Sequence, residues 1–320
     1  MRESTFGVVD VAHATGQVNS IEEAALEFGR SGDFLDRRIG TRSLPRLSED
    51  QKASDLAQEA VENLLLRNPD VSVDDIDTLM VVTQNGDHSG LPHTSAILQA
   101  ALGMRTSTFC ADVGLGCSGY VHALKLVQGL HAVGQTQNAL LVTADPYSRI
   151  LDPADYSTQL LFGDAATASL LSSNSEWTVG NGTFFTDGTR GSSISMESGA
   201  LHMDGKAILG FAKRDVTRLI RQAMADQGLR MEDVDLFLIH QGSRVVVETV
   251  AQEFPDVRDR FPLHIDQLGN TVSSTIPLLL EKYISDRSIR HLLLVGFGVG
   301  LSAGVITLDR RALGEEKRVG

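Results

Sequence analysis

One cysteine stands where a nucleophile could be activated. Cys117 lies between two glycines in "DVGLGCSGY" (residues 112–120) and opens a largely apolar segment, residues 117–134, that predicts a buried helix. The free N–H groups at a helix N-terminus favour a thiolate over a thiol, so we expect the pKa of Cys117 to be lowered. A thiolate there can attack a thioester. The alternative is a small packing residue, which is our interpretation of Cys110.

Three further segments could supply hydrogen-bond donors to a reacting carbonyl. His240 ends the predicted strand "DLFLIH", and strand ends are where α/β proteins commonly build sites. Asn270 lies in "LGNTVSST", a turn that precedes another helix. The run "GFGVG" (residues 296–300) follows a long apolar strand, and its backbone N–H groups can approach a substrate oxygen closely. Each signal alone is weak, because such histidines and turns are often structural.

The strands that must position these residues occur twice in the chain. Three apolar segments in the first half, each with a polar or glycine-bearing exit, match three in the second half in the same order. Amphipathic helices are predicted at equivalent places, at residues 48–67, with Ser48 as the N-cap, and at residues 215–229. The matched strands are residues 74–86 and 232–243, 138–145 and 291–298, and 163–171 and 300–308.

This duplication predicts the fold class. Helices that alternate with short, continuously apolar strands indicate an α/β fold whose sheets are covered on both faces. We expect residues 1–174 to form the half that carries Cys117, and residues 175–320 to form the half that carries His240 and Asn270.

Composition narrows the classes of function. The 320 residues carry a net charge of -13 and a pI near 5.1, which argues against nucleic acid or an anionic membrane as main partner. Two cysteines cannot form the disulfide framework of a secreted domain, and His88 and His93 lack a third metal ligand. Because no signal peptide pattern and no apolar run of about 18 residues occurs, we expect a cytoplasmic protein.

The order of the motifs is more specific than any one of them. A cysteine, a histidine, a Gly-Asn-Thr turn and a glycine-rich strand exit follow one another, and "DPADYSTQLLFGDAATASLL" (residues 152–171) adds a further segment. In these motifs the chain resembles the ketoacyl synthase III family, the condensing enzymes of the thiolase fold. The resemblance implies a thiolase-like fold in which two duplicated αβαβα halves form a five-layered sandwich. It also implies a homodimer that needs no cofactor beyond its thioester substrates.

The resemblance assigns roles to the reactive residues. It implies that Cys117 accepts an acyl group from a thioester donor, and that His240 and Asn270 bind the carbonyl of a malonyl thioester and stabilise the enolate formed by decarboxylation. The oxyanion hole for the tetrahedral intermediate would comprise the N–H of Cys117 and one from the loop Gly298–Gly300. In that loop Val299 stands where relatives often have a third glycine.

The resemblance also implies where substrates bind, and there the sequence departs from the family. Phe34 and Tyr156 stand where relatives often have a tryptophan and an arginine that clasp the adenine of coenzyme A. Arg38 is retained as a phosphate contact. Leu91 replaces an aromatic residue that reaches into the partner subunit's acyl tunnel, and Phe297 is assigned to the substrate site as well.

The segment after the histidine differs too. The family's "HQAN" reads "HQGS" here, so Ser243 replaces an asparagine and Arg244 follows it. Arg244, Lys213 and Arg214 could attract an acidic acyl carrier protein, although solvated surface charge is an equal alternative.

Three functions stay open at this point. The leading hypothesis is a decarboxylative condensing enzyme of a specialised fatty-acid or polyketide-type pathway. The second is an acyltransferase that moves the acyl group from Cys117 to a hydroxyl or an amine. The third is an inactive partner subunit of a condensing pair. The sequence leaves the acyl donor, its chain length and the choice between coenzyme A and a carrier protein undecided.

Overall fold

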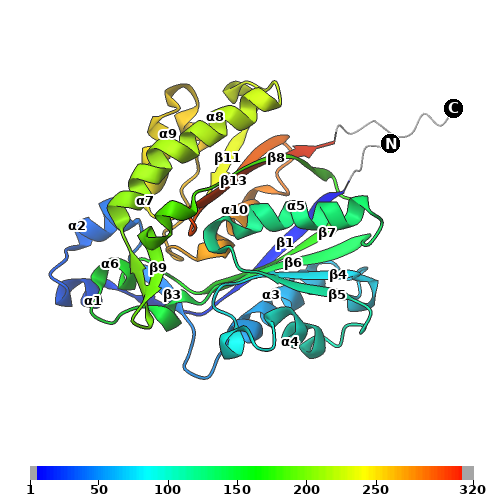
Figure 1. Ribbon diagram of the computed structural model, residues 1–320, viewed down its shortest axis with the longest axis horizontal. Helices are drawn as coiled ribbons and strands as arrows, with labels where there is room; N and C mark the ends of the chain where they lie inside the picture. The colour runs from blue at the N-terminus through cyan, green and yellow to red at the C-terminus, as the bar shows by residue number, and fades with distance from the viewer. Residues whose placement is uncertain (1–5, 312–320) are drawn as a thin grey trace.

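Two large β-sheets and three layers of helices form the body of the protein (Figure 1). The computed structural model describes residues 6–311. Helices cover the outer face of each sheet and fill the space between the sheets, which gives the five layers expected of a thiolase-like fold. In this described part of the chain no helix is long and apolar enough to span a membrane.

The first sheet has five strands in the order β1-β7-β6-β4-β5. Its central strands are buried apolar runs, as strands covered on both faces require. β4 pairs in parallel with β5 and β6, whereas β7 runs antiparallel to β6 and β1. The strands are β1 (Gly7–Thr15), β4 (Thr78–Val82), β5 (Phe109–Val113), β6 (Asn138–Ala144) and β7 (Ala165–Ser172).

The second sheet repeats four strands of the first. Its order is β11-β12-β13-β8, and each neighbouring pair has the direction of the equivalent pair in the order β4-β6-β7-β1. The three predicted sequence matches are β4 with β11, β6 with β12 and β7 with β13, so the internal duplication is confirmed. The strands are β8 (Trp177–Thr186), β11 (Leu236–Ile239), β12 (His291–Gly298) and β13 (Ser302–Arg310).

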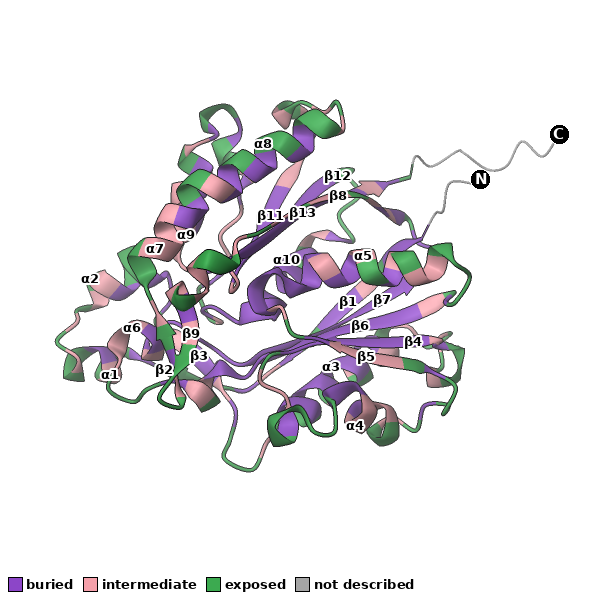
Figure 2. Ribbon diagram, in the orientation of Figure 1, coloured by how far each residue is buried: buried purple, intermediate pink, exposed green. Residues whose placement is uncertain are grey.

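The helices occupy equivalent layers in the two halves. α3 packs on the outside of the first sheet and α8 on the outside of the second, while α5 and α10 lie between the sheets. Figure 2 shows that most of α10 is buried, from Thr275 to Leu280, in keeping with its apolar sequence. The helices are α3 (Ala53–Arg67), α4 (Thr94–Ala101), α5 (Gly119–Ala132), α8 (Thr217–Asp226), α9 (Arg244–Gln252) and α10 (Thr275–Tyr283).

Shorter elements gather at one end of the layers, at the left of Figure 1. Two pairs of short strands and four short helices lie there, and several of them surround the cavity described below. They are β2 (Gln17–Ser20), β3 (Ser43–Arg46), β9 (Ile194–Glu197), β10 (Ala200–Met203), α1 (Glu22–Glu27), α2 (Gly32–Phe34), α6 (Tyr156–Gln159) and α7 (Gly205–Phe211).

The predicted start of α3 is wrong. The helix begins at Ala53 with Lys52 as its N-cap, so the N-cap lies closer to the C-terminus than Ser48. The N–H of Ser48 is instead bonded to the side chain of Gln51, 3.1 Å away. Asp87, from the exit of β4, accepts the N–H of Ala53 at 3.0 Å and so supplies the cap from a distant segment.

The division into halves at residue 174 stays a prediction. β7 ends at Ser172 and β8 begins at Trp177, so the strands on either side of residue 174 belong to different sheets.

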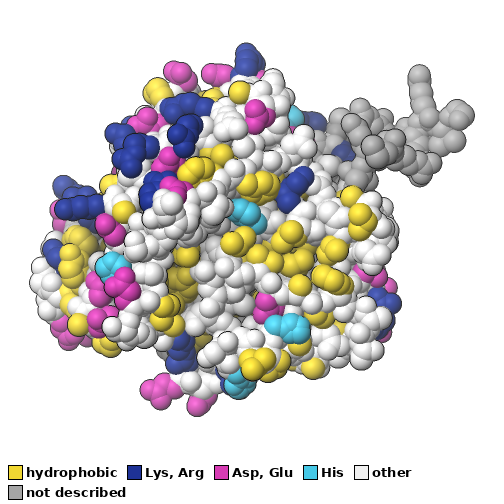
Figure 3. All heavy atoms as spheres, in the orientation of Figure 1, with side chains coloured by type: hydrophobic (Ala, Val, Ile, Leu, Met, Phe, Trp, Pro, Cys, Tyr) yellow, Lys and Arg dark blue, Asp and Glu magenta, His cyan; other side chains and the backbone are white. Residues whose placement is uncertain are grey.

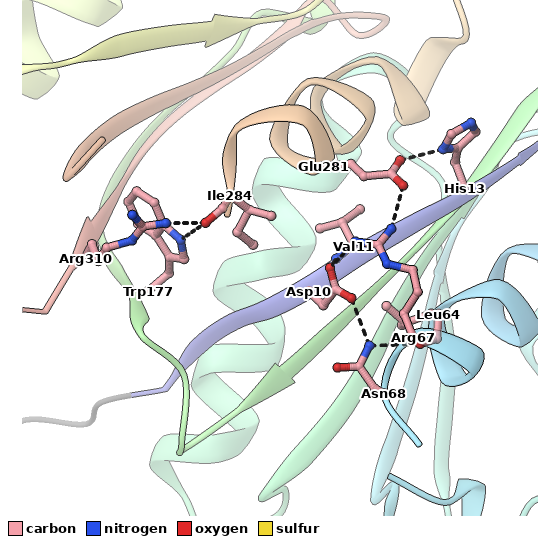
Figure 4. Close-up of polar contacts among 10 residues, drawn as sticks. All are labelled: Asp10, Val11, His13, Leu64, Arg67, Asn68, Trp177, Glu281, Ile284 and Arg310. Atoms are coloured by element: carbon pink, nitrogen blue, oxygen red, sulfur yellow. Dashed lines mark hydrogen bonds and ion pairs between the residues drawn. The ribbon is translucent and has the colours of Figure 1, made fainter. Parts of the chain in front are cut away.

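Polar contacts tie α10 to both sheets (Figure 4). Glu281 accepts hydrogen bonds from Arg67 of α3, at 2.8 Å, and Arg67 in turn contacts Asp10 of β1 at 2.7 Å. At the end of α10 the carbonyl of Ile284 accepts the indole N–H of Trp177, on β8, at 2.9 Å. These contacts fix the helix whose first residues lie beside Asn270.

Replacing Trp177 by phenylalanine should weaken this anchor. Trp177 is 1 % exposed, and its substitution removes both buried ring volume and the bond to Ile284. We expect the free energy of unfolding, measured by urea denaturation, to fall by about 1–3 kcal/mol. A fall below about 0.5 kcal/mol, the usual effect of a surface substitution, would show that the contact does not anchor the helix.

Candidate active site

The three predicted reactive side chains converge on one cavity. Cys117, His240 and Asn270 are 5 %, 4 % and 4 % exposed, and all three line a cavity of about 320 Å³. They come from the exits or starts of three different elements that lie near the centre of the molecule. Buried polar groups at such a place need hydrogen-bond partners, and these partners determine what each group can do.

Cys117 is positioned by a close approach between the two halves. It lies in a short 3-10 turn (Gly116–Ser118) directly before α5. The end of β12 passes so near that a Cβ added to Gly298 would be 2.8 Å from the Cβ of Cys117. A Cβ added to Gly296 would be 3.0 Å from the Cα of Ser118. Glycine at both positions is therefore required for the backbone of the second half to reach the cysteine.

Burial sets the protonation state of the thiol. Loss of water raises the pKa of Cys117 to about 12, and the charge of Asp145 acts in the same direction. Hydrogen bonding from the backbone of Cys117 and Val299 lowers the pKa of the thiol, but by less than burial raises it. The sequence-based expectation of a lowered pKa is wrong for the free protein, because the predicted helix N-terminus is enclosed rather than open to water.

The same two N–H groups are placed to bind an oxyanion. The backbones of Cys117 and Val299 are near the sulfur, so their N–H groups are candidates to bind the carbonyl oxygen of an acyl group attached to it. Gly298 lines the cavity beside them. Gly300, the third predicted loop residue, lies outside the cavity lining and adopts a φ of 133°, which a residue with a side chain rarely adopts.

His240 is held as a neutral imidazole. Its Nδ1 lies 2.7 Å from the hydroxyl oxygen of Thr275, the first residue of α10. The ring of Phe297 meets the imidazole edge to face, with centroids 5.5 Å apart and planes at 89°. Burial lowers the pKa of His240 to about 3, so the ring is uncharged at neutral pH.

Asn270 presents its amino group to the cavity. Its side-chain oxygen Oδ1 accepts the N–H of Val272 at 2.9 Å, which leaves Nδ2 as the free end of the amide. Val272 adopts a φ of 54°, a strained conformation for a β-branched residue. The backbone N–H of Asn270 is bonded to the carbonyl of Leu161, at 2.9 Å, and this bond fixes the turn.

The structure brings some predicted binding residues to this cavity. Arg38, Ser243, Phe297, Gly298 and Val299 line it together with the three reactive residues. Ser243 also caps α9, because its hydroxyl accepts the N–H of Val246 at 3.2 Å.

Four other predicted residues lie outside the lining. Phe34 and Tyr156 contact each other with ring centroids 6.3 Å apart, and the guanidinium of Arg30 lies 3.9 Å from the centroid of Tyr156. Leu91 is 84 % exposed, and Arg244 pairs with Glu248 on the same helix. None of these four residues lines the cavity.

Sequence reasoning missed several residues of the site. Tyr147 is 3 % exposed and donates its hydroxyl proton to the side chain of Gln84 at 2.7 Å. It lines both the cavity that holds Cys117 and a second cavity of about 600 Å³. No motif marks it. Thr275, by contrast, belongs to the segment "NTVSST", whose unusual run of hydroxyls could have indicated partners for the histidine.

The raised pKa of Cys117 predicts how alkylation depends on pH. Because the thiolate is the nucleophile, the rate with iodoacetamide should rise about tenfold per pH unit from about pH 6 to about pH 9, with no plateau. Comparison with Cys117→Ser, which keeps Cys110, isolates the reaction of this thiol. A rate that levels off near neutral pH would show that the free protein already holds a thiolate.

Comparisons with known proteins agree with this geometry. The model of "3-Oxoacyl-[acyl-carrier-protein (ACP)] synthase III" matches residues 111–188, and that of its C-terminal domain matches residues 224–310. The beta-ketoacyl-[acyl-carrier-protein] synthase III of Streptococcus sanguinis is 33 % identical, and the match covers 93 % of this chain and 97 % of that protein.

Solved structures agree as well. A crystal structure of a 3-oxoacyl-(acyl-carrier-protein) synthase III superimposes with a TM-score of 0.89 at 30 % identity, covering 95 % of this chain and 99 % of that chain. The corresponding structure from Pseudomonas aeruginosa superimposes with a TM-score of 0.88 at 27 % identity, covering 96 % of this chain and 99 % of that chain. The chain therefore belongs to the 3-oxoacyl-[acyl-carrier-protein] synthase III family of thiolase-fold condensing enzymes.

Proposed function

We propose that this protein condenses an acyl thioester with a malonyl thioester, with Cys117 as the acylated nucleophile and His240 and Asn270 as donors to the enolate. The observation that carries the proposal is the enclosure of all three side chains in one cavity, which Val299 and Gly298 also line. The relatives named above bear this activity in their names. A free amide donor next to a neutral imidazole favours enolate binding over simple acyl transfer.

The first half-reaction is a thiol exchange. The sulfur of Cys117 attacks the donor's carbonyl carbon, and the N–H groups of Cys117 and Val299 stabilise the oxyanion of the tetrahedral intermediate. The bond from carbon to the donor sulfur then breaks, and the proton of the Cys117 thiol ends on the departing sulfur. The donor leaves as a free thiol, so the exchange consumes no net acid or base.

The second half-reaction forms the new carbon–carbon bond. The bond between the malonyl carboxylate and its methylene carbon breaks, carbon dioxide leaves, and the electron pair forms an enolate whose oxygen accepts hydrogen bonds from His240 and Asn270. The enolate carbon attacks the acyl carbon on Cys117. The cysteine departs as a thiolate and takes one proton from solvent, which regenerates the thiol.

Basic side chains at the cavity suit the phosphate of a pantetheine arm, which coenzyme A and acyl carrier proteins share. Arg38 and Lys206 line the cavity, and in the described part of the chain neither makes an ion pair. Lys213 and Arg214 lie in the turn between α7 and α8. Figure 3 shows Lys and Arg side chains over the region of α2, α7 and α8. We propose that an acidic carrier docks there, and that no cofactor is needed beyond the thioesters.

The carrier of the acyl donor and the pathway are also proposals. The rings of Phe34 and Tyr156 meet edge to face, with their planes at 67°, and the guanidinium of Arg30 lies over the ring of Tyr156. The two rings therefore do not form a parallel slot for an adenine. This supports a carrier-bound donor and a specialised fatty-acid or polyketide-type pathway of the cytoplasm rather than the use of acetyl coenzyme A alone.

Two substitutions separate the half-reactions. Cys117→Ala should abolish mass gain from every acyl thioester in intact-protein mass spectrometry, whereas the matched variant Cys110→Ala should acylate like wild type. Asn270→Asp keeps the oxygen that accepts the N–H of Val272 but removes the amino donor. It should acylate normally and release carbon dioxide from malonyl thioester about 100-fold to 1,000-fold more slowly. Acylation of Cys117→Ala, or undiminished release by Asn270→Asp, would contradict the assigned roles.

We also propose that the protein is a homodimer joined along β5. This strand is at the edge of the first sheet, and Phe109 at its start is 48 % exposed. An unpaired edge with exposed apolar side chains favours pairing with a second strand. Leu91, 84 % exposed, would then reach the partner subunit's acyl site.

Phe109→Asp should weaken this association by placing a charge at the edge. We expect light scattering after size exclusion to give a dimer for wild type and a larger monomer fraction for the variant at equal concentration. A wild-type monomer at micromolar concentration, or a variant that dimerises as tightly as wild type, would argue against pairing through β5.

A further inference from the structure

His240 must carry its single ring proton on the correct nitrogen to act as a donor. A neutral imidazole has one N–H and one lone pair, and the two tautomers exchange these roles. Only the tautomer with the proton on Nε2 can donate into the cavity, provided that Nε2 faces it. The neighbours of the two ring nitrogens indicate which of them carries the proton.

The two ring nitrogens face different neighbours. Nδ1 is bonded to Thr275, which is 2 % exposed and begins α10. Nε2 lies toward Gly242, where an added Cβ would be 3.4 Å from it, and Gly242 lines the catalytic cavity. The edge-to-face contact with Phe297 fixes the plane of the ring between these neighbours.

The hydroxyl proton of Thr275 has two acceptors within reach. Nδ1 of His240 is 2.7 Å from the hydroxyl oxygen, and the carbonyl oxygen of Val272 is 3.2 Å from it. Hydroxyl donors form bonds of about 2.5–3.0 Å, so the contact with Val272 is longer than a normal hydroxyl bond. The shorter contact favours Nδ1 of His240 as the acceptor of this proton.

We propose that Thr275 is a positioning residue that donates its hydroxyl proton to Nδ1 of His240 and thereby holds the ring proton on Nε2. This inference rests on the proposed function, because it explains how a neutral histidine becomes an obligatory donor to the enolate oxygen. It has a second consequence. In this tautomer Nε2 has no free lone pair, so His240 does not remove the proton of Cys117.

The test compares two substitutions of Thr275, one that removes its hydroxyl and one that keeps it. Thr275→Val removes the hydroxyl and keeps the branched side chain, and Thr275→Ser restores the hydroxyl. Thr271→Val is the matched control, because Thr271 is 1 % exposed in the same turn and its hydroxyl has no hydrogen-bond partner in the described chain.

Nitrogen-15 NMR of protein labelled at histidine reports the tautomer directly, and His240→Gln identifies the signals of His240. We expect wild type, Thr275→Ser and Thr271→Val to carry the proton on Nε2, and Thr275→Val to lose this preference. A purely structural role for Thr275 would not move the proton between nitrogens. A wild-type spectrum with the proton on Nδ1 would overturn the proposal even if no variant folded.

Kinetics supply the second readout. Thr275→Val should release carbon dioxide from malonyl thioester at least about tenfold more slowly than wild type, while acylation of Cys117 changes less than about twofold. Thr275→Ser should recover most of the lost rate. Unchanged release by Thr275→Val would overturn the proposal. Failure of wild type to release carbon dioxide with any substrate would instead reject the proposed function, and the tautomer would still be read from the spectra.

Discussion

The site depends on one close approach of backbone to backbone. The end of β12, in the second half of the chain, passes within contact distance of the turn that carries Cys117, in the first half, and only glycine at positions 296 and 298 leaves room for it. This approach brings Gly298 against the sulfur and places Val299 in the lining of the same cavity. The same enclosure excludes water, raises the pKa of the thiol and keeps His240 neutral.

The internal duplication explains why three polar residues can meet in a buried place. α5 and α10 are equivalent helices that lie between the sheets, and each begins with a 3-10 turn. Cys117 lies in the turn before α5, and Asn270 and Thr275 flank the turn before α10. Since the starts of the two helices face the same cavity, a duplicated scaffold supplies the proposed nucleophile from one copy and the proposed donors from the other.

Much of this could be predicted from the sequence because it rests on local patterns. The apolar strands, their repetition and the order of the motifs identified the fold and placed Cys117, His240 and Asn270 together. The pKa of Cys117 could not be predicted, because it depends on enclosure by a strand about 180 residues away in the sequence. The bond between His240 and Thr275 and the cap that Asp87 gives to α3 are also contacts between distant segments, which periodicity does not reveal.

A single-turnover experiment tests the central claim most directly. Wild-type protein loaded with an acyl group on Cys117 is mixed with malonyl thioester labelled with carbon-13 at its free carboxylate. Loss of the acyl group, labelled carbon dioxide and the β-ketoacyl thioester are then followed together. The account predicts equal amounts of all three with one shared rate constant. Loss of the acyl group without carbon dioxide, as in transfer to a hydroxyl, an amine or water, would contradict it.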